Sequence, residues 1–200
     1  RLARKLQNSY DVIMYDARGH GLSEKPESGY TPIEHMLDLV GVIAALDLQK
    51  PILIGHSMGG VTCAMASAEY PELVRASILE DPVWRWPLPY DEGVAAKRNV
   101  YDNWYARLAY RKTLSPAEGY ARGQRERPLW SPEDLDAEVE SKAHVSMHVL
   151  EYILLHDDTW AQQVIKFQSP VQLIYANPSL GGIVGPDVAA EARWINPLVQ

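Results

Sequence analysis

The feature that most constrains this chain is the hexapeptide Gly55-His56-Ser57-Met58-Gly59-Gly60. The segment before it, Pro51–Ile54, is short and apolar and is bounded by polar residues, which is typical of a buried strand. The segment from Met58 to Tyr70 favours a helix. A serine hydroxyl is a poor nucleophile unless it is held out of a sheet beside a base, and a sharp strand-to-helix turn holds it in that way. The hexapeptide therefore predicts that Ser57 is a nucleophile.

The residues around Ser57 fit this interpretation. Gly55 and Gly59 are expected to be glycines because side chains there would collide across the turn. The helix that begins at Met58 directs free N–H groups and its positive end toward the turn. We therefore predict that the Met58 N–H is an oxyanion donor. A short glycine–serine–glycine pattern also arises by chance, so the prediction depends on finding a strand before it and a helix after it.

Further strands and helices alternate around this turn. A capping box at Thr31-Pro32-Ile33-Glu34 opens a helix that is predicted to reach about Leu48. Continuous apolar strands that alternate with helices indicate a parallel sheet covered on both faces. The predicted strands are Tyr10–Tyr15, Pro51–Ile54, Val74–Leu79 and Pro170–Tyr175.

A long stretch without a strand signal separates the last two predicted strands. Its helices begin at Ser115-Pro116-Ala117-Glu118 and Ser131-Pro132-Glu133-Asp134, so it is predicted to be a helical cap. The predicted organisation is a core over 1–83, a cap over 84–168 and the rest of the core over 169–200. Aromatic side chains of the cap could line an acyl pocket or form the core of the cap itself. Its tryptophans are Trp84, Trp86, Trp104, Trp130 and Trp160.

The hexapeptide resembles the nucleophile elbow of the α/β-hydrolase superfamily. The segment Asp16-Ala17-Arg18-Gly19-His20-Gly21-Leu22-Ser23 resembles the turn after the preceding strand in the same family. The resemblance implies an α/β fold with a parallel sheet and an inserted helical cap, lacking here the first strands and the last strand. It also implies that a serine at position 57 belongs to an esterase, lipase, C–C bond hydrolase, amidase or cofactor-free haloperoxidase. No cofactor is implied.

The resemblance also indicates which parts should lie outside the chain. The catalytic histidine of the family follows its last strand, whereas all six histidines here precede the fourth predicted strand. We therefore expect the histidine, and the loop that carries the second oxyanion donor, to lie beyond these 200 residues. In the sheets of this family, another strand lies in space between those that correspond to Tyr10–Tyr15 and Pro51–Ile54. That strand comes earlier in the sequence, so here it should precede Arg1. On this basis the isolated chain is expected to be inactive and poorly folded.

The catalytic acid has more than one candidate. The family usually places it after the strand predicted at Pro170–Tyr175, but the following loop has no carboxylate before Asp187. Asp187 lies in the first turn of the closing helix, where an acid also complements the helix dipole. The other position known in the fold follows the preceding strand, where Asp81 stands with Glu80 beside it. We predict Asp81, with Glu80 in reserve and Asp187 as the alternative.

Composition excludes several partners. Acids outnumber bases 26 to 19, and the charge of −7 argues against nucleic acid. No apolar run approaches the roughly 18 residues of a membrane span. The single Cys63 favours a reducing compartment, so a cytoplasmic location is predicted, although a signal peptide upstream of Arg1 and the oligomeric state stay open. His144, His148 and Glu151 have a metal-like spacing, but an exposed helix face is favoured and no metal is predicted.

Together these features predict a serine hydrolase that acts on a small-molecule acyl substrate. Ser57 attacks an ester-like carbonyl (or an amide or C–C bonded one), a histidine outside the chain takes its proton, and Asp81 orients that histidine. The alternative is a ligand-binding or signalling protein that keeps the fold without turnover.

Overall fold

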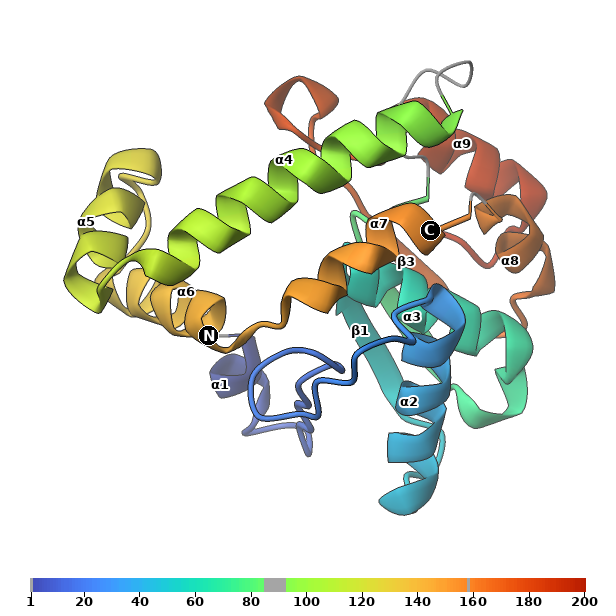
Figure 1. Cartoon of the computed structure of the whole chain (residues 1–200). Helices are drawn as coiled ribbons and strands as arrows, with labels where there is room; N and C mark the ends of the chain where they lie inside the picture. Colours follow the sequence, from blue (N-terminus) through green and yellow to red (C-terminus); the bar gives the residue numbers. More distant parts are fainter. Residues whose placement is uncertain (1, 85–92, 158) are drawn as a thin grey trace.

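The computed structural model describes residues 2–84, 93–157 and 159–200 and is built around a parallel sheet (Figure 1). The strands β1 (Ile52–His56), β2 (Ala76–Glu80) and β3 (Val171–Ile174) lie in the order β1-β2-β3. In this register His56 pairs with Glu80, and Glu80 pairs with Ile174. The carboxyl ends of all three strands therefore meet at one edge of the sheet, where parallel α/β folds carry their sites.

Helices pack against this sheet and extend beyond it. Helix α3 packs directly on β1 and β2, and α2 and α8 pack on α3. Short 3-10 helices at Pro71–Leu73, Met147–Leu150 and Pro178–Leu180 are labelled η1, η2 and η3. The α-helices are α1 (Leu2–Leu6), α2 (Pro32–Ala45), α3 (Met58–Glu69), α4 (Gly93–Thr113), α5 (Pro116–Glu126), α6 (Pro132–His144), α7 (Glu151–Leu155), α8 (Trp160–Lys166) and α9 (Pro186–Ile195).

The main core lies between the sheet and α3. Helix α3 is rich in small residues, and Ala64 and Ala66 are fully buried. Small side chains let the helix approach the strands closely, so that Leu79 and Val171 are also almost entirely buried. Close packing at this point fixes the position of the β1–α3 turn relative to the sheet.

The predicted strand at Tyr10–Tyr15 is wrong: this segment forms no strand and lies largely exposed. Met14 is 78% exposed, and the side chains of Ile52 and Ile54 on β1 are also open to solvent. β1 pairs with β2 on one side, and within the described residues no strand pairs with its other edge. An apolar run becomes a strand only when a neighbouring strand accepts its backbone hydrogen bonds, and Tyr10–Tyr15 has no such neighbour here.

The last residues begin another parallel strand beside β3. The Val171 N–H donates to the Leu198 carbonyl at 2.9 Å, and the Leu173 N–H donates to the Gln200 carbonyl at 2.9 Å. Val199 forms a parallel bridge with Val171. Residues 198–200 therefore lie along the edge of β3 that does not pair with β2.

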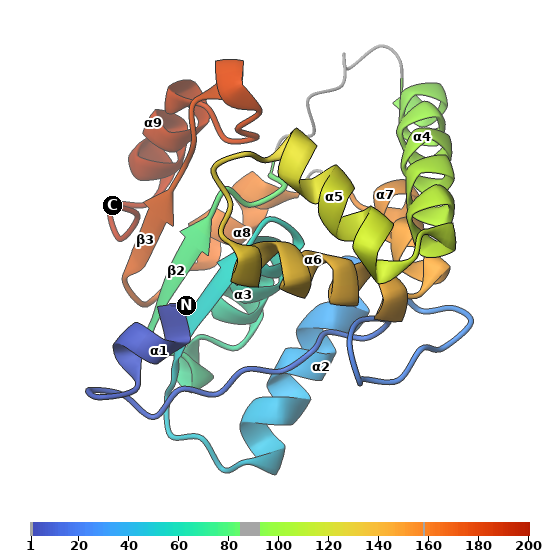
Figure 2. The ribbon, with the colours of Figure 1, turned by 90° about the vertical axis from the view of Figure 1, so that its left-hand side faces the viewer.

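The predicted cap region contains helices α4 to α7, of which α4, α5 and α6 extend to one side of the sheet (Figures 1 and 2). The predicted starts at Ser115 and Ser131 are confirmed, since each forms a capping box with the residue three positions later. Leu108, Val145, Leu150 and Ile153 form a second, smaller buried cluster. None of the helices in the described ranges is long and apolar enough to cross a membrane.

The metal-like spacing does not produce a shared helix face. His144 ends α6, His148 lies in η2 and Glu151 begins α7, so the three side chains belong to three elements. His148 Nδ1 lies 2.7 Å from the Glu151 carboxylate, which gives His148 an ordinary polar partner. Within residues 2–84, 93–157 and 159–200, no group of three His, Cys, Asp or Glu side chains is arranged to hold a metal ion.

Candidate active site

The backbone at Ser57 forms the sharp turn that its sequence predicts. β1 ends at His56 and α3 begins at Met58, so Ser57 alone connects strand to helix. Ser57 has φ 52° and ψ −116°, a conformation that is unfavourable for a residue with a side chain. Its N–H donates to the Glu80 carbonyl on β2 at 2.9 Å, which holds the strained residue against the sheet. Strain of this kind is typical of a functional position.

One of the two expected glycine requirements is confirmed and the other is wrong. A Cβ on Gly55 would lie 2.1 Å from the Gly59 carbonyl oxygen, so only glycine fits at position 55. A Cβ on Gly59 would meet nothing within 4 Å. The backbone of Gly59, and not its side-chain position, faces Gly55. The second constrained glycine is Gly60, where a Cβ would lie 3.0 Å from the Pro82 side chain.

Met58 is the first residue of α3. Its N–H belongs to the first helical turn, which has no carbonyl four residues earlier to accept it within the helix. This N–H follows Ser57 directly and lies at the positive end of the helix dipole. These features suit an oxyanion donor, and that role stays a prediction for Met58.

Asp81 occupies the equivalent position on the neighbouring strand. It follows the last residue of β2, has φ 42° and is 8% exposed. Its carboxylate accepts the Ile183 N–H at 3.0 Å on both oxygens and the Val184 N–H at 2.8 Å on Oδ1. These donors lie in the loop after β3, so the loop that lacks a nearby carboxylate supplies N–H groups to the carboxylate of Asp81.

The other two acid candidates lie in different surroundings. Glu80 is the last residue of β2, and its side chain is exposed. Asp187 lies in the first turn of α9, as expected, and is exposed as well. Of the three carboxylates, Asp81 is the buried one and the one held by the loop after β3.

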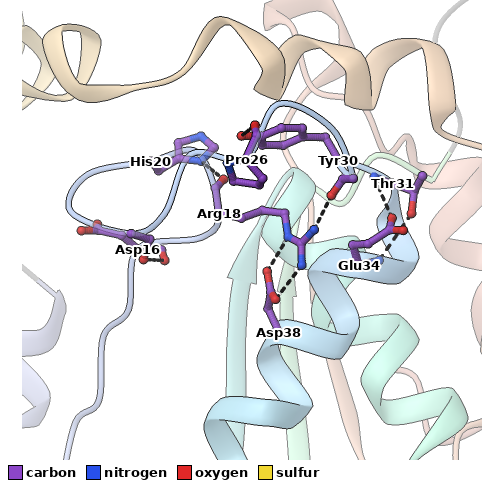
Figure 3. Close-up of polar contacts among 10 residues, drawn as sticks. Asp16, Arg18, His20, Pro26, Tyr30, Thr31, Glu34 and Asp38 are labelled. Atoms are coloured by element: carbon purple, nitrogen blue, oxygen red, sulfur yellow. Dashed lines mark hydrogen bonds and ion pairs between the residues drawn. The ribbon is translucent and has the colours of Figure 1, made fainter.

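The loop between Tyr15 and α2 is fixed by Arg18, a residue to which sequence reasoning gave no role (Figure 3). The Arg18 guanidinium donates two hydrogen bonds to the Asp38 carboxylate, at 2.6 and 2.7 Å, and a third to the Gly29 carbonyl. The hydrogen bond to Asp38 raises the pKa of Arg18. The predicted capping box of Thr31 and Glu34 is confirmed at the start of α2. Arg18 thus attaches the loop to the helix.

The histidines do not complete a triad. In the described part of the chain, none of the six histidine rings hydrogen-bonds to Ser57 or Asp81. His35 and His156 are buried, and their ring centroids lie 5.6 and 5.4 Å from that of Tyr152. Burial lowers the pKa of His35 to about 4 and also lowers the pKa of His156. Sequence reasoning missed this cluster because separate elements bring its members together.

Trp84 and Trp160 pack together in the main core. Their rings stack with centroids 5.4 Å apart, and Trp84 is 1% exposed. Trp104 and Trp130 are 54% and 44% exposed, and Trp86 lies outside the described residues. Trp84 and Trp160 therefore belong to the main core beside the sheet, and the separate core expected for the cap contains neither of them.

A strained serine between a strand and a helix, with a buried carboxylate at the end of the next strand, is the arrangement that the sequence predicted for an α/β-hydrolase site. The family model of the alpha/beta hydrolase fold matches residues 1–120. The chain therefore belongs to the alpha/beta hydrolase family, and its curated relatives include a named hydrolase.

Two curated relatives illustrate the match. The chain is 42% identical over 77 residues to the 2-(acetamidomethylene)succinate hydrolase of Mesorhizobium japonicum, which covers 38% of this chain. It is 37% identical to a non-heme chloroperoxidase of Streptomyces lividans over 76 residues, and this match covers 37% of the present chain. In both cases the matched segment spans 28% of the relative's length.

Solved structures show the same fold over nearly the whole chain. The N-formylmaleamic acid deformylase of Pseudomonas putida S16 superposes with a TM-score of 0.79 at 22% identity, covering 100% of this chain and 75% of the deformylase chain. An E-2-(acetamidomethylene)succinate hydrolase superposes with a TM-score of 0.74 at 24% identity, covering 98% of this chain and 73% of the other. The predicted fold class is confirmed, and this chain holds part of that fold.

Proposed function

We propose that this protein is a serine hydrolase that cleaves a small-molecule acyl substrate through an acyl-enzyme on Ser57. The observation that carries the proposal is that two strained residues, Ser57 and Asp81, follow the ends of two adjacent strands. Ser57 supplies the nucleophile, and the N–H of Met58 stabilises the oxyanion that forms on the carbonyl oxygen.

The proposed reaction has two steps. Ser57 Oγ attacks the carbonyl carbon and gives its proton to a histidine, which passes it to the leaving group as the scissile bond breaks. Water then attacks the acyl-enzyme and regenerates Ser57 Oγ–H. We assign the histidine to a position outside these 200 residues, and Asp81 orients it. The N–H groups of Ile183 and Val184 hold the Asp81 carboxylate in place for that contact.

The scissile group is proposed to be an ester, with an amide as the next candidate and a C–C bond after it. The amide deserves a direct test because two similar proteins are a 2-(acetamidomethylene)succinate hydrolase and an N-formylmaleamic acid deformylase. No cofactor enters the proposed reaction. We place the enzyme in the cytoplasm, because its one cysteine, Cys63, is buried and unpaired.

The experiment uses the full-length protein, its Ser57→Ala variant and a Ser28→Ala variant, since Ser28 is exposed on the loop before α2. A fluorophosphonate probe should label the wild type and Ser28→Ala but not Ser57→Ala. Two substrates are tested, a p-nitrophenyl ester and an amide that carries a carboxylic acid group. Hydrolysis of the substrate should fall by several orders of magnitude in Ser57→Ala and stay unchanged in Ser28→Ala. Equal labelling of all three proteins, or a loss of hydrolysis of less than about tenfold, would overturn the proposal.

A further inference from the structure

A cavity among helices α4, α5 and α6 has more basic than acidic side chains in its lining. This cavity of about 140 Å³ lies between the end of α4 and the helices α5 and α6. Two acids, Glu126 and Glu138, face five basic side chains across it. The basic residues are Arg111, Lys112, Arg122, Arg127 and Lys142. The lining therefore carries a formal excess of positive charge.

Both carboxylates of the cavity pair with arginines. Glu138 accepts from Arg111 at 2.6 Å on one oxygen and from Arg127 on the other. Glu126 accepts from Arg111 at 3.0 Å and from Arg122 at 2.7 Å, again on separate oxygens. Each carboxylate oxygen thus has a guanidinium partner, and the two acids offset only part of the positive charge of the lining.

The two lysines have no carboxylate partner among the described residues. Lys112 donates to the Ala143 carbonyl at 3.0 Å, and Lys142 is half-buried without an ion pair. Burial lowers the pKa of both lysines. For Lys142 the charge of Glu138 acts in the opposite direction, and the charges of Arg111 and Arg127 lower the pKa further. A half-buried ammonium group without an ion pair is costly, and an anion beside it reduces that cost.

The arginines are held in place and still have donors to offer. The Arg122 guanidinium lies over the Tyr110 ring at 5.1 Å, and the Arg127 guanidinium lies over the Trp130 ring at 4.5 Å. A guanidinium has five N–H donors, and the ion pairs use only one from Arg122 and one from Arg127. The remaining N–H groups suit the oxygens of an anion.

We propose that this cavity binds a small dianion with oxygen acceptors, such as a phosphate or a dicarboxylate. Lys142 supplies the unpaired charge, and Arg122 and Arg127 supply preorganised N–H donors. All lining residues lie between 111 and 143, and α5 and α6 stand at the far end of α4 from the β1–α3 turn (Figure 1). The site is therefore separate from Ser57, and binding does not depend on the proposed hydrolysis.

The test titrates the full-length protein with inorganic phosphate and, separately, with succinate by isothermal calorimetry at low ionic strength, with chloride as the background. We expect saturable binding of at least one dianion. Lys142→Gln should weaken it by about tenfold, because one charge-assisted hydrogen bond is lost. Lys142 makes no ion pair with a described residue, so this variant leaves the Arg–Glu pairs intact.

Two controls make the result decisive. Arg98→Gln removes a cation of α4 that pairs with Asp102 outside the cavity, and it should bind the dianion as the wild type does. Ser57→Ala should also bind normally. If phosphate binds more tightly than succinate, the ligand of the cavity is a phosphate; the opposite order indicates a dicarboxylate. Absence of saturable binding of both, or unchanged affinity in a folded Lys142→Gln protein, would overturn the proposal.

Discussion

Ser57 and Asp81 directly follow two residues that pair across adjacent parallel strands, His56 and Glu80, and both have a positive φ. The Ser57 N–H extends the strand pairing by donating to the Glu80 carbonyl at 2.9 Å, and the Asp81 N–H donates to Ile174 at 2.7 Å. Two strained non-glycine residues at one edge of a sheet are best explained by a shared function.

The first prediction concerns the acid. In the full-length protein, Asp81→Asn should lower kcat strongly, because an amide cannot orient and stabilise a cationic imidazole. Asp187→Asn is the matched control, and because Asp187 is exposed in the first turn of α9 it should change kcat by less than about twofold. Steady-state kinetics of the two variants measures this, and the opposite ranking would assign the acid to Asp187.

The second prediction concerns the turn. Gly55→Ala should lower the free energy of unfolding by roughly 3 kcal/mol, since its Cβ would overlap the Gly59 carbonyl oxygen. Gly59→Ala should be neutral or stabilising by up to about 1 kcal/mol, because nothing blocks its Cβ and alanine favours a helix. Urea unfolding of both variants compares them directly. Equal losses would mean that the turn does not have the described backbone.

The third prediction concerns Arg18. Arg18→Lys should lower the free energy of unfolding by about 1 kcal/mol, because an ammonium cannot form the two parallel bonds to Asp38 and also reach the Gly29 carbonyl. Arg98→Lys, at an exposed pair with Asp102, should change it by less than about 0.5 kcal/mol. Thermal unfolding measures both, and an unchanged Tm in Arg18→Lys would contradict the prediction.

The fourth prediction concerns pH. Burial lowers the pKa of His35 to about 4, whereas an unfolded histidine titrates near about 6.5. Between these values the unfolded chain binds the extra proton. The free energy of unfolding should therefore fall as the pH is lowered from about 6.5 toward 4, by at most about 1.4 kcal/mol per pH unit from this group.

The control for this pH effect is a second histidine. His35→Leu should show a shallower loss of stability between about pH 7 and pH 5 than the wild type, while the exposed His144→Gln should follow the wild type. The slope should not vanish in His35→Leu, because burial lowers the pKa of His156 as well. Urea unfolding at the two pH values gives the slopes. Identical slopes in all three proteins would contradict the assignment to His35.

The fifth prediction concerns the tryptophans. Trp84→Ala should lower the free energy of unfolding by about 3 kcal/mol or more, because it removes a fully buried ring from the stack with Trp160. Trp104→Ala, at a side chain that is 54% exposed, should cost much less. A Trp84→Ala protein of normal stability with an altered preference for acyl chain length would instead assign Trp84 to a substrate pocket.

The sequence predicted most of the elements around the site because their signals are local. The apolar runs before Ser57 and Asp81 and the capping boxes at Thr31, Ser115 and Ser131 each depend on neighbouring residues only. The prediction of a strand at Tyr10–Tyr15 was wrong because a strand also needs a neighbouring strand. A short stretch of sequence does not show whether such a neighbour is present. The bonds from Ile183 and Val184 to Asp81 join residues about a hundred positions apart, which no local pattern encodes.

The stacked pair of Trp84 and Trp160 joins the two places where the polypeptide leaves the sheet layer and returns to it. An insertion whose two ends meet at one point places no demand on the spacing of β2 and β3. The intervening helices could therefore be shortened or exchanged, as a segment with closely spaced ends allows, while the strands keep their register. The contact between the two rings thus separates the packing of the sheet from the packing of the helices between them.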